Sequence, residues 1–528
     1  MVDLSRNSVM TPDALKRFMK LLKRMGYNTL LLYMEDTYFM ESDPYIGYLR
    51  ARYSPEELRS IDEYAESLHM EVIPCIQTLA HLKNVLKWNK YPKDGADVLM
   101  VGAEESYALI DRMLGFFKGI FRSKKIHVGM DEARELGRGK YLDEVGYEDK
   151  LVIMKRHLDR VNELCKKHEL QPMIWGDMIF SVGNNGNHIV GRKELSREAL
   201  RVCPRSVIPV HWDYWGQNPG RYEVMLENYR QFSNKTWFAG CIWGWSGLVP
   251  HLRFSINTMK CAIDACRAQS CRNIFFCLWG DDGGECSHFA KLPALYYLAQ
   301  YAKGITDEAV IKEGFKRFTG LEFDEFMLLD MPNEIAGNER GAANPCNPSK
   351  YMLYSDLFNG FLDYTVSEGA NERYAALAEQ LHAVAKKSRK FGYIFDNAAK
   401  LCDVLALKSE MGVLVRRAYQ SGKRWDLELY AKRDYPEMIR RAEGFAKAFE
   451  KQWMTENKPQ GFDCHDIRLG GMLRRLEYCR RTLNLYLDHK VDSIPELEEE
   501  ILPFGTKGVS TALNDALCTM SPSAQYVP

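Results

Sequence analysis

Two adjacent carboxylates, Asp131 and Glu132, are the residues whose type and spacing most directly suggest chemistry. They follow the largely apolar stretch 126–130, so they stand where a buried strand is expected to end. Neighbouring side chains of a regular strand point to opposite faces. Both carboxylates can therefore serve one site only if the backbone bends, and Gly129 makes such a bend feasible. The alternative is that Asp131 caps the helix that follows, which is the commoner role of an isolated Asp-Glu pair.

Polar or aromatic side chains also stand at or just after the ends of the other predicted strands. They are Arg6; Glu35 and Asp36; Gln77 and His81; Trp175 and Asp177; Asp213 and Tyr214; Trp243 and Trp245; Trp279 and Asp281. Aromatic rings offer flat faces to the C–H surface of a sugar, while carboxylates and arginine bind its hydroxyls. Each residue alone could be structural, but their occurrence at every strand end favours a sugar-binding site.

The elements that must position these residues are repeated βα units. Short, mostly apolar runs predict strands at 2–5, 29–34, 71–77, 125–129, 172–175, 207–211, 237–242 and 273–278. Start signals for helices follow the first two runs, at Thr11-Pro12 and at Ser54-Pro55 with Glu57. About eight such units predict a (β/α)8 TIM barrel with its site at the carboxyl ends of the strands. The alternative, an open doubly wound sheet, needs a glycine-rich turn after the first strand, and residues 4–8 contain no glycine.

The strand pattern stops near residue 304, and the remainder reads as helical. The stretches 372–387, 398–419 and 470–487 are predicted helices. We therefore expect a catalytic barrel at 1–305 and a mainly α-helical C-terminal domain at 306–528. Three roles stay open for this domain: completing the leaving-group side of the pocket, forming a homodimer, or bracing the barrel.

Composition excludes several classes of partner. The chain has 528 residues, 71 Lys plus Arg against 71 Asp plus Glu, and a pI near 7.1, so no global charge attracts nucleic acid or anionic membranes. Neither a signal peptide nor an apolar run long enough to span a membrane is evident. The 14 cysteines are scattered without a CxxC pair, which favours free thiols in a reducing cytoplasm over zinc sites or disulfides.

The string His127-Val-Gly-Met-Asp131-Glu132-Ala133 resembles the H-x-G-x-D-E core of glycoside hydrolase family 20, the β-N-acetylhexosaminidases. The likeness extends through residues 1 to about 305. The further matching segments are Asp3-Leu-Ser-Arg6-Asn7, Leu32-Tyr-Met-Glu35-Asp36-Thr37-Tyr38, Ile73-Pro74-Cys-Ile-Gln77-Thr-Leu-Ala-His81, Ile174-Trp175-Gly-Asp177-Met178, Trp212-Asp213-Tyr214 and Leu278-Trp279-Gly-Asp281. The combination is more specific than any single segment.

The resemblance implies a retaining hydrolase that removes terminal N-acetylglucosamine or N-acetylgalactosamine by substrate assistance. In this mechanism the 2-acetamido oxygen of the substrate is the nucleophile and forms an oxazolinium ion. Carried over by motif, Glu132 is the general acid and base, Asp131 orients the acetamide, and Tyr214 bonds its oxygen. The other implied substrate contacts are Arg6, His81, Trp175, Asp177, Trp212, Trp243, Trp245, Trp279, Asp281 and Glu285. No cofactor and no metal are expected.

Two departures from the family pattern and two rival functions qualify this prediction. Many members carry an α/β domain ahead of the barrel, which we expect this chain to lack because its first predicted strand starts at residue 2. The family often has glutamate where this chain has Asp281, which leaves open the choice between gluco- and galacto-configured sugars. A metal-dependent barrel hydrolase would usually show an HxH pair, and none is present. A non-catalytic glycan-binding barrel would not require an acid such as Glu132.

Overall fold

The computed structural model describes residues 1–182, 184, 186–195, 197–334 and 345–502, and its sheet has eight parallel strands paired in sequence order. The strands are β1 (Val2–Asp3), β2 (Thr29–Tyr33), β3 (Glu71–Cys75), β4 (Lys125–His127), β5 (Gln171–Trp175), β6 (Ile208–Trp212), β7 (Trp237–Cys241) and β8 (Ile274–Cys277). A bridge between Val2 and Leu278 joins the last strand to the first, so the sheet closes on itself. The predicted (β/α)8 barrel is confirmed, with strand ends that differ by at most two residues.

The strands are apolar on both sides because both sides are covered. In β2, Leu30, Leu31 and Leu32 are each no more than 1% exposed, although successive side chains point to opposite faces. One face of each strand fills the barrel interior, and the other lies under the outer helices. Burial on both faces is typical of parallel strands. A sheet with one solvent-exposed face would instead show alternating apolar and polar residues.

The first two outer helices begin where their capping residues predict. The Ala14 N–H donates to the Thr11 hydroxyl at 3.2 Å and starts α1 (Pro12–Met25). At α2 (Pro55–Ser67), the Glu57 N–H donates to Ser54 Oγ at 3.2 Å, and the Ser54 N–H donates to Glu57 Oε2 at 2.8 Å. These reciprocal bonds satisfy backbone donors that the first helical turn leaves unpaired.

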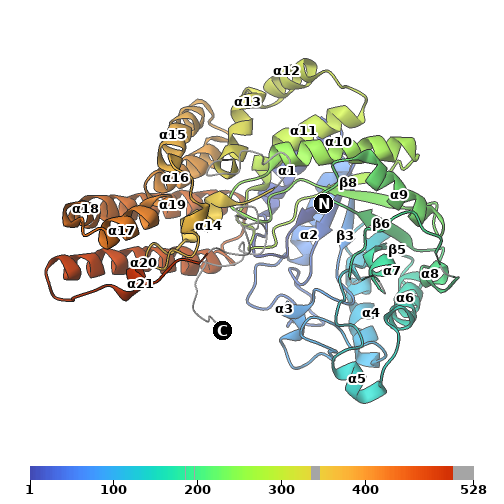
Figure 1. Ribbon diagram of the computed structural model, residues 1–528. Coiled ribbons are helices and arrows are strands. Elements are labelled where there is room, and N and C mark those ends of the chain that lie inside the picture. Colours follow the sequence, from blue (N-terminus) through green and yellow to red (C-terminus); the bar gives the residue numbers. More distant parts are fainter. Residues whose placement is uncertain (183, 185, 196, 335–344, 503–528) are drawn as a thin grey trace. The chain divides into compact units, whose positions relative to one another are not determined.

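Further helices, long and short, follow the later strands (Figure 1). They are α3 (Lys83–Leu86), α4 (Glu104–Lys118), α5 (Lys140–Val145), α6 (Lys150–Lys167), α7 (Asp177–Ser181), α8 (Arg197–Val202), α9 (Pro219–Arg230) and α10 (Leu252–Ala268). By its internal contacts, the barrel unit comprises residues 1–242, 256–279 and 301–303.

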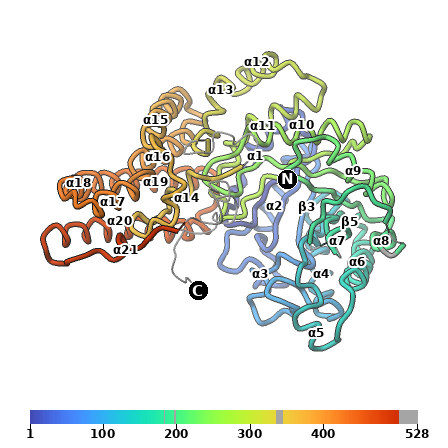
Figure 2. Tube along the Cα trace, viewed as in Figure 1, coloured from blue at the N-terminus to red at the C-terminus, as the bar shows by residue number. Residues whose placement is uncertain are grey.

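The second compact unit comprises residues 243–255, 280–300 and 304–528. Its elements, from η1 onward, are η1 (His288–Lys291), α11 (Leu292–Ala302), α12 (Glu308–Thr319), α13 (Phe323–Phe326), η2 (Met327–Asn333), α14 (Pro348–Tyr354), η3 (Asp363–Thr365), α15 (Ala370–Lys387), α16 (Gly392–Lys408), α17 (Met411–Gln420), α18 (Arg424–Leu429), η4 (Tyr430–Asp434), α19 (Tyr435–Glu456), α20 (Asp463–Leu487) and α21 (Pro495–Glu498). Neighbours in the series α15, α16, α19 and α20 pack against each other (Figure 2). The predicted helical character of this region is confirmed.

The prediction of one continuous helix over 398–419 is wrong, because the structure has two helices there, α16 and α17. The Ser409 hydroxyl donates to the Leu405 carbonyl at 2.8 Å, and the Glu410 N–H donates to the Asn371 side chain at 3.2 Å. The backbone N–H of Glu410 therefore bonds to a side chain of α15 rather than to a carbonyl of α16. This change of partner ends α16.

Among the helices of the described ranges, none has the length and apolar character needed to cross a bilayer.

Candidate active site

The backbone turns sharply between β4 and the adjacent carboxylates. Gly129, Met130 and Glu132 all have positive φ, at 72°, 73° and 47°. A Cβ atom at Gly129 would stand 1.9 Å from Oε1 of Gln77, so no other residue fits without a shift. The bend that the sequence requires for Asp131 and Glu132 to share a site is confirmed, and two non-glycine residues hold a conformation that costs about 1 kcal/mol or more each.

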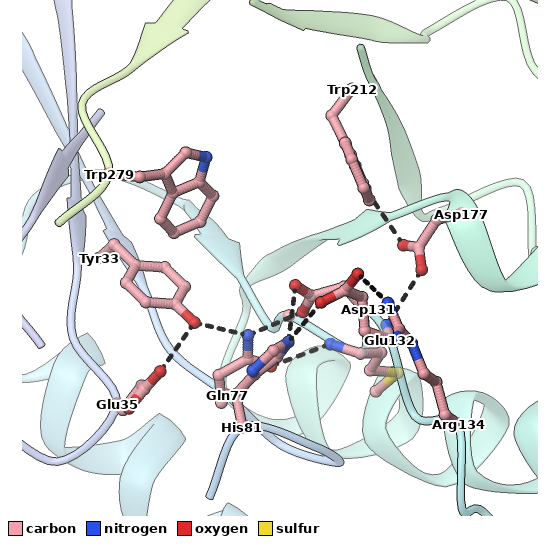
Figure 3. Close-up of polar contacts among 12 residues, drawn as sticks. Tyr33, Glu35, Gln77, His81, Asp131, Glu132, Arg134, Asp177, Trp212 and Trp279 are labelled. Atoms are coloured by element: carbon pink, nitrogen blue, oxygen red, sulfur yellow. Dashed lines mark hydrogen bonds and ion pairs between the residues drawn. The ribbon is translucent and has the colours of Figure 1, made fainter. Parts of the chain in front are cut away.

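His81 lies against both carboxylates. Its Nε2 atom is 3.2 Å from Asp131 Oδ2 and 3.7 Å from Glu132 Oε2, which shows that the two carboxylates face the same space (Figure 3). Burial opposes a charge on His81, but the adjacent Asp131 carboxylate outweighs it and raises the pKa of His81 to about 9. The imidazole therefore stays protonated through neutral pH and places a positive charge beside the pair.

Asp131 is buried and ionised. Gln77 donates from Nε2 to Asp131 Oδ1 at 2.8 Å and to the Tyr33 hydroxyl at 3.0 Å, while the Tyr33 hydroxyl donates to Glu35 at 3.1 Å. Burial alone would raise the pKa of Asp131, but the charge and hydrogen bond of His81 and the bond from Gln77 lower it. The result is a fixed negative charge in a site sheltered from water.

Glu132 is the more accessible carboxylate of the pair, with 37% of its side chain exposed. Its Oε1 atom lies 3.0 Å from the guanidinium of Arg134, which is itself mostly exposed. Its backbone N–H donates to Oδ2 of the buried Asp177 at 3.0 Å. Asp131 is therefore enclosed and contacted by two side chains, whereas the Glu132 side chain is partly exposed and its backbone N–H is bonded to Asp177.

Asp177 begins α7, directly after β5, and connects two other site residues. Its Oδ2 atom accepts from Glu132 as described, and its Oδ1 atom accepts from Trp212 Nε1 at 3.3 Å (Figure 3). Burial first, and then the charge of Asp131, raises the pKa of Asp177 to about 7. Because both of its oxygens already bind protein donors, the contacts of Asp177 suit the positioning of Glu132 and Trp212.

Aromatic rings surround this group of carboxylates. The rings of Trp175 and Trp279 lie 6.0 Å apart between centroids, and Trp212 stacks on Tyr214 at 5.3 Å. Trp279 Nε1 donates to the Tyr214 hydroxyl at 3.0 Å, which orients that hydroxyl. Trp175 and Tyr214 are only 1% and 5% exposed. These rings form a largely apolar wall with one placed hydroxyl, a composition typical of small-ligand sites.

Arg6 follows β1 and lies among acidic and aromatic groups. Its guanidinium is 2.9 Å from Asp3 and 3.5 Å from Glu35, and it stands 5.0 Å from the ring centroid of Tyr33 and 5.3 Å from that of Trp279. The ion pairs and ring contacts fix its direction, so its planar fork is preorganised for bidentate binding.

Four of the predicted site residues belong to the second unit. Trp243 and Trp245 lie with ring centroids 3.8 Å apart, and Asp281 is exposed. The buried carboxylate of Glu285 is 2.6 Å from Lys350 and 2.9 Å from Arg468. These pairs favour a role for Glu285 in holding its own loop rather than in binding a ligand.

The other predicted site residues are joined by contacts within the barrel unit. These are Arg6, His81, Asp131, Glu132, Trp175, Asp177, Trp212, Tyr214 and Trp279. Glu35 and Gln77, which the sequence analysis placed at strand ends without assigning them a role, also contact this group, and so do Tyr33 and Arg134. Nothing in the sequence pattern marks the hydroxyl of Tyr33 or the guanidinium of Arg134.

Two family models match separate parts of the chain. The model described as glycosyl hydrolase family 20, catalytic domain, matches residues 1–218, and the model described as glycoside hydrolase 20C C-terminal domain matches residues 324–514. The first match covers the barrel from β1 to β6 and the second lies in the helical region, and both models belong to one hydrolase family.

Two curated relatives and one solved structure are similar to parts of the chain. Hexosaminidase D of Homo sapiens is 26% identical over 283 residues, a match that covers 47% of this chain and about half, 53%, of that protein. Hexosaminidase D of Bos taurus is 26% identical over 351 residues, covering 61% of this chain and 94% of that protein. A GH20 exo-β-N-acetylglucosaminidase from Vibrio harveyi aligns with a TM-score of 0.46 and 15% identity over 62% of this chain and 58% of that one. With family models matching both its barrel and its helical region, the chain belongs to glycoside hydrolase family 20.

Proposed function

We propose that the protein is a retaining exo-β-N-acetylhexosaminidase that releases terminal β-linked N-acetylglucosamine or N-acetylgalactosamine from glycans. The observation that carries this proposal is the pair of adjacent carboxylates turned to one side at the end of β4, one buried and ionised, the other accessible. Family membership and the hexosaminidase names of the relatives support the same activity.

In the proposed mechanism the substrate supplies its own nucleophile. Glu132 protonates the departing glycosidic oxygen while the acetamido oxygen attacks the anomeric carbon, and Glu132 then takes a proton from the water that opens the oxazolinium ion. The negative charge of Asp131 orients the acetamide N–H and offsets the positive charge that develops on nitrogen. Tyr214, oriented by Trp279, donates its hydroxyl proton to the acetamido oxygen.

The remaining proposed contacts bind the sugar ring and its acetamide. Trp175, Trp212 and Trp279 enclose the acetamide methyl and the ring face, and Arg6 binds ring hydroxyls. His81 contacts both carboxylates, and its positive charge stabilises the ionised form of Asp131. For Trp243, Trp245, Asp281 and Glu285 a sugar contact stays a prediction, and so does the preference between gluco and galacto configuration.

Three more general expectations also stay proposals. Buried thiols such as Cys75, Cys241 and Cys277 support a reducing location, the cytoplasm. A domain boundary at 305/306 stands as predicted from the sequence, and a homodimer stays one of the three roles left open for the helical domain.

Hydrolysis of a chromogenic aryl β-N-acetylglucosaminide, with and without a chelator, tests the proposed activity. We expect turnover that the chelator does not change. Binding of the sugar without turnover would instead indicate a non-catalytic glycan-binding barrel, and loss of turnover with chelator would indicate a metal-dependent hydrolase.

Arg6→Lys is expected to raise KM about tenfold with little change in kcat, because lysine cannot reproduce the bidentate fork. Initial rates over a range of substrate concentrations measure the effect. Arg59→Lys, at an exposed arginine on α2, is the matched control and should change neither constant. A lowered melting temperature with unchanged kinetic constants would show that Arg6 only pairs with Asp3 and Glu35.

Asp177→Asn is expected to lower kcat about tenfold to a hundredfold, because a charge-assisted hydrogen bond to the backbone of Glu132 is lost. Since the pKa of Asp177 is raised to about 7, the carboxylate and its support of Glu132 are present above that pH and are lost as the pH falls through it. We therefore expect kcat of the wild type to fall as the pH drops through about 7, and the variant to lack this fall. Asp13→Asn, at an exposed aspartate, serves as control. An unaltered pH profile of kcat in Asp177→Asn would contradict the positioning role.

A further inference from the structure

Two loops at the catalytic end of the barrel present a group of apolar side chains to solvent. The loop after β2 spans residues 34–54, and the loop after β3 spans residues 76–103 and includes α3 (Figure 1). Tyr45, Tyr48 and Leu49 are 44%, 45% and 78% exposed, and Trp88 beside them is half-buried. We call these four side chains the aromatic platform. Large apolar side chains gathered on a surface mark interaction sites more often than scattered ones do.

The three rings of the platform contact one another. Trp88 meets Tyr45 and Tyr48 edge-on, with centroids 5.5 Å and 5.6 Å away, and the two tyrosine rings lie 6.4 Å apart. The Lys87 amine is 5.3 Å from the Trp88 centroid, and the Lys90 amine is 5.2 Å from that of Tyr45. The platform therefore combines ring faces with phenol and amine donors at its border.

A buried carboxylate ties the two loops together. Asp43, in the loop after β2, accepts from the Lys90 amine at 2.7 Å and the Tyr91 hydroxyl at 2.8 Å, both in the loop after β3. Arg112 of α4 adds a third bond at 3.1 Å. The rings are thus preorganised, which reduces the entropy that binding would otherwise cost.

The backbone beneath the platform holds an uncommon conformation. Gly47 and Leu49 have φ of 62° and 64°, and a Cβ atom at Gly47 would stand 2.3 Å from the carbonyl oxygen of Asp36. Leucine rarely adopts this left-handed region, and here it does so while its side chain faces solvent. Strain of this kind persists at binding sites more often than elsewhere.

The loop that carries the tyrosines is also anchored to the candidate active site. Arg50 donates to the carboxylate of Asp36 and to the carbonyl oxygen of Ser5. These partners are the chain neighbours of Glu35 and Arg6. The platform and the sugar-binding end of the barrel are thus parts of one hydrogen-bonded framework.

We propose that the aromatic platform binds the sugar residues on the leaving-group side of the scissile bond. This inference rests on the proposed function, because an exo-acting enzyme encloses only the terminal sugar and the rest of the glycan must extend across the rim loops. Aromatic rings stack on the C–H faces of pyranose rings, and bordering donors bind hydroxyls. Four side chains suit one or two sugar rings, whereas a stable protein interface uses about 20 to 30 residues on each side.

The test compares short and long substrates in the double variant Tyr45→Ala/Tyr48→Ala. The probes are an aryl β-N-acetylglucosaminide and two trisaccharides with terminal N-acetylglucosamine, linked β-1,4 to N-acetylglucosamine or β-1,3 to galactose. We expect kcat/KM to fall about tenfold on at least one trisaccharide, mainly through KM, as about 1.4 kcal/mol of lost stacking implies. The rate on the aryl substrate should stay within about twofold of the wild type, since the closed pocket is untouched.

Tyr45→Phe/Tyr48→Phe is the matched control, because it keeps the rings and should retain most of the rate on the trisaccharides. Unchanged rates of the alanine variant on both trisaccharides would overturn the inference. So would an equal loss on all three substrates, or a change in sedimentation coefficient with unchanged rates, which would indicate a protein contact. A wild-type protein without activity toward the aryl substrate would refute the proposed function itself.

Discussion

Glu132→Gln is expected to lower kcat by about 10² to 10⁴ on substrates with poor leaving groups, because glutamine keeps the shape but carries no transferable proton. Aryl substrates whose phenols are strongly acidic need little protonation and should lose much less. Rates across a series of aryl leaving groups measure this difference. The exposed position of the Glu132 side chain, beside His81 and Arg134, gives it access to a glycosidic oxygen.

Glu135→Gln is the matched control for this series. Glu135 is an exposed carboxylate three residues further along the chain, and its replacement should leave rates unchanged. Equal losses for Glu132→Gln across good and poor leaving groups would show that Glu132 is not the acid. Circular dichroism of both variants establishes that the fold is retained.

Asp131→Asn is expected to lower kcat by about 10² to 10³ and to weaken binding of a thiazoline mimic of the cyclic intermediate, because it removes the fixed charge that faces the developing positive nitrogen. A second expectation follows from the same chemistry. A β-glucoside with a plain 2-hydroxyl offers no acetamide nucleophile, so the wild type should turn it over slowly or not at all. Inhibition constants for the thiazoline and initial rates on paired substrates measure both.

Asp159→Asn, at a partly exposed aspartate of α6 that pairs with Lys155, controls for the loss of one negative charge elsewhere on the barrel. Comparable rates on the plain glucoside, or a covalent adduct of a fluorosugar on Asp131, would contradict substrate assistance. Either result would also remove the assignment of Asp131 as the group that orients the acetamide.

The local elements of the barrel could be predicted because their causes are local. Apolar runs such as 29–34 specify a strand buried on both faces, and Thr11 and Ser54 mark helix starts through bonds that span only three residues. The break between α16 and α17 was missed because its cause is distant in sequence. Glu410 turns to Asn371, a partner 39 residues away, and no local pattern reports that bond.

The candidate site could be predicted only in part. The motif around Asp131 and Glu132 and the aromatic residues at strand ends identified most of the members by type. Position at a strand end also identified Gln77, although its role was not predicted: it bonds both Asp131 and the Tyr33 hydroxyl. For Glu285 the sugar contact that the family resemblance implies stays a prediction, and in the structure Lys350 and Arg468 bind its carboxylate.

By itself the sequence determined the strand order, the need for a bend at Gly129 and the residue types available at the site, because these depend on side-chain chemistry and short-range geometry. Only the tertiary structure decided which groups are charged and what they face. Asp131 is ionised because His81, fifty residues earlier in the chain, is folded against it, and Asp177 turns back to Glu132 rather than toward open space. Burial and long-range charge set a pKa, and neither exists until the strand ends are brought together.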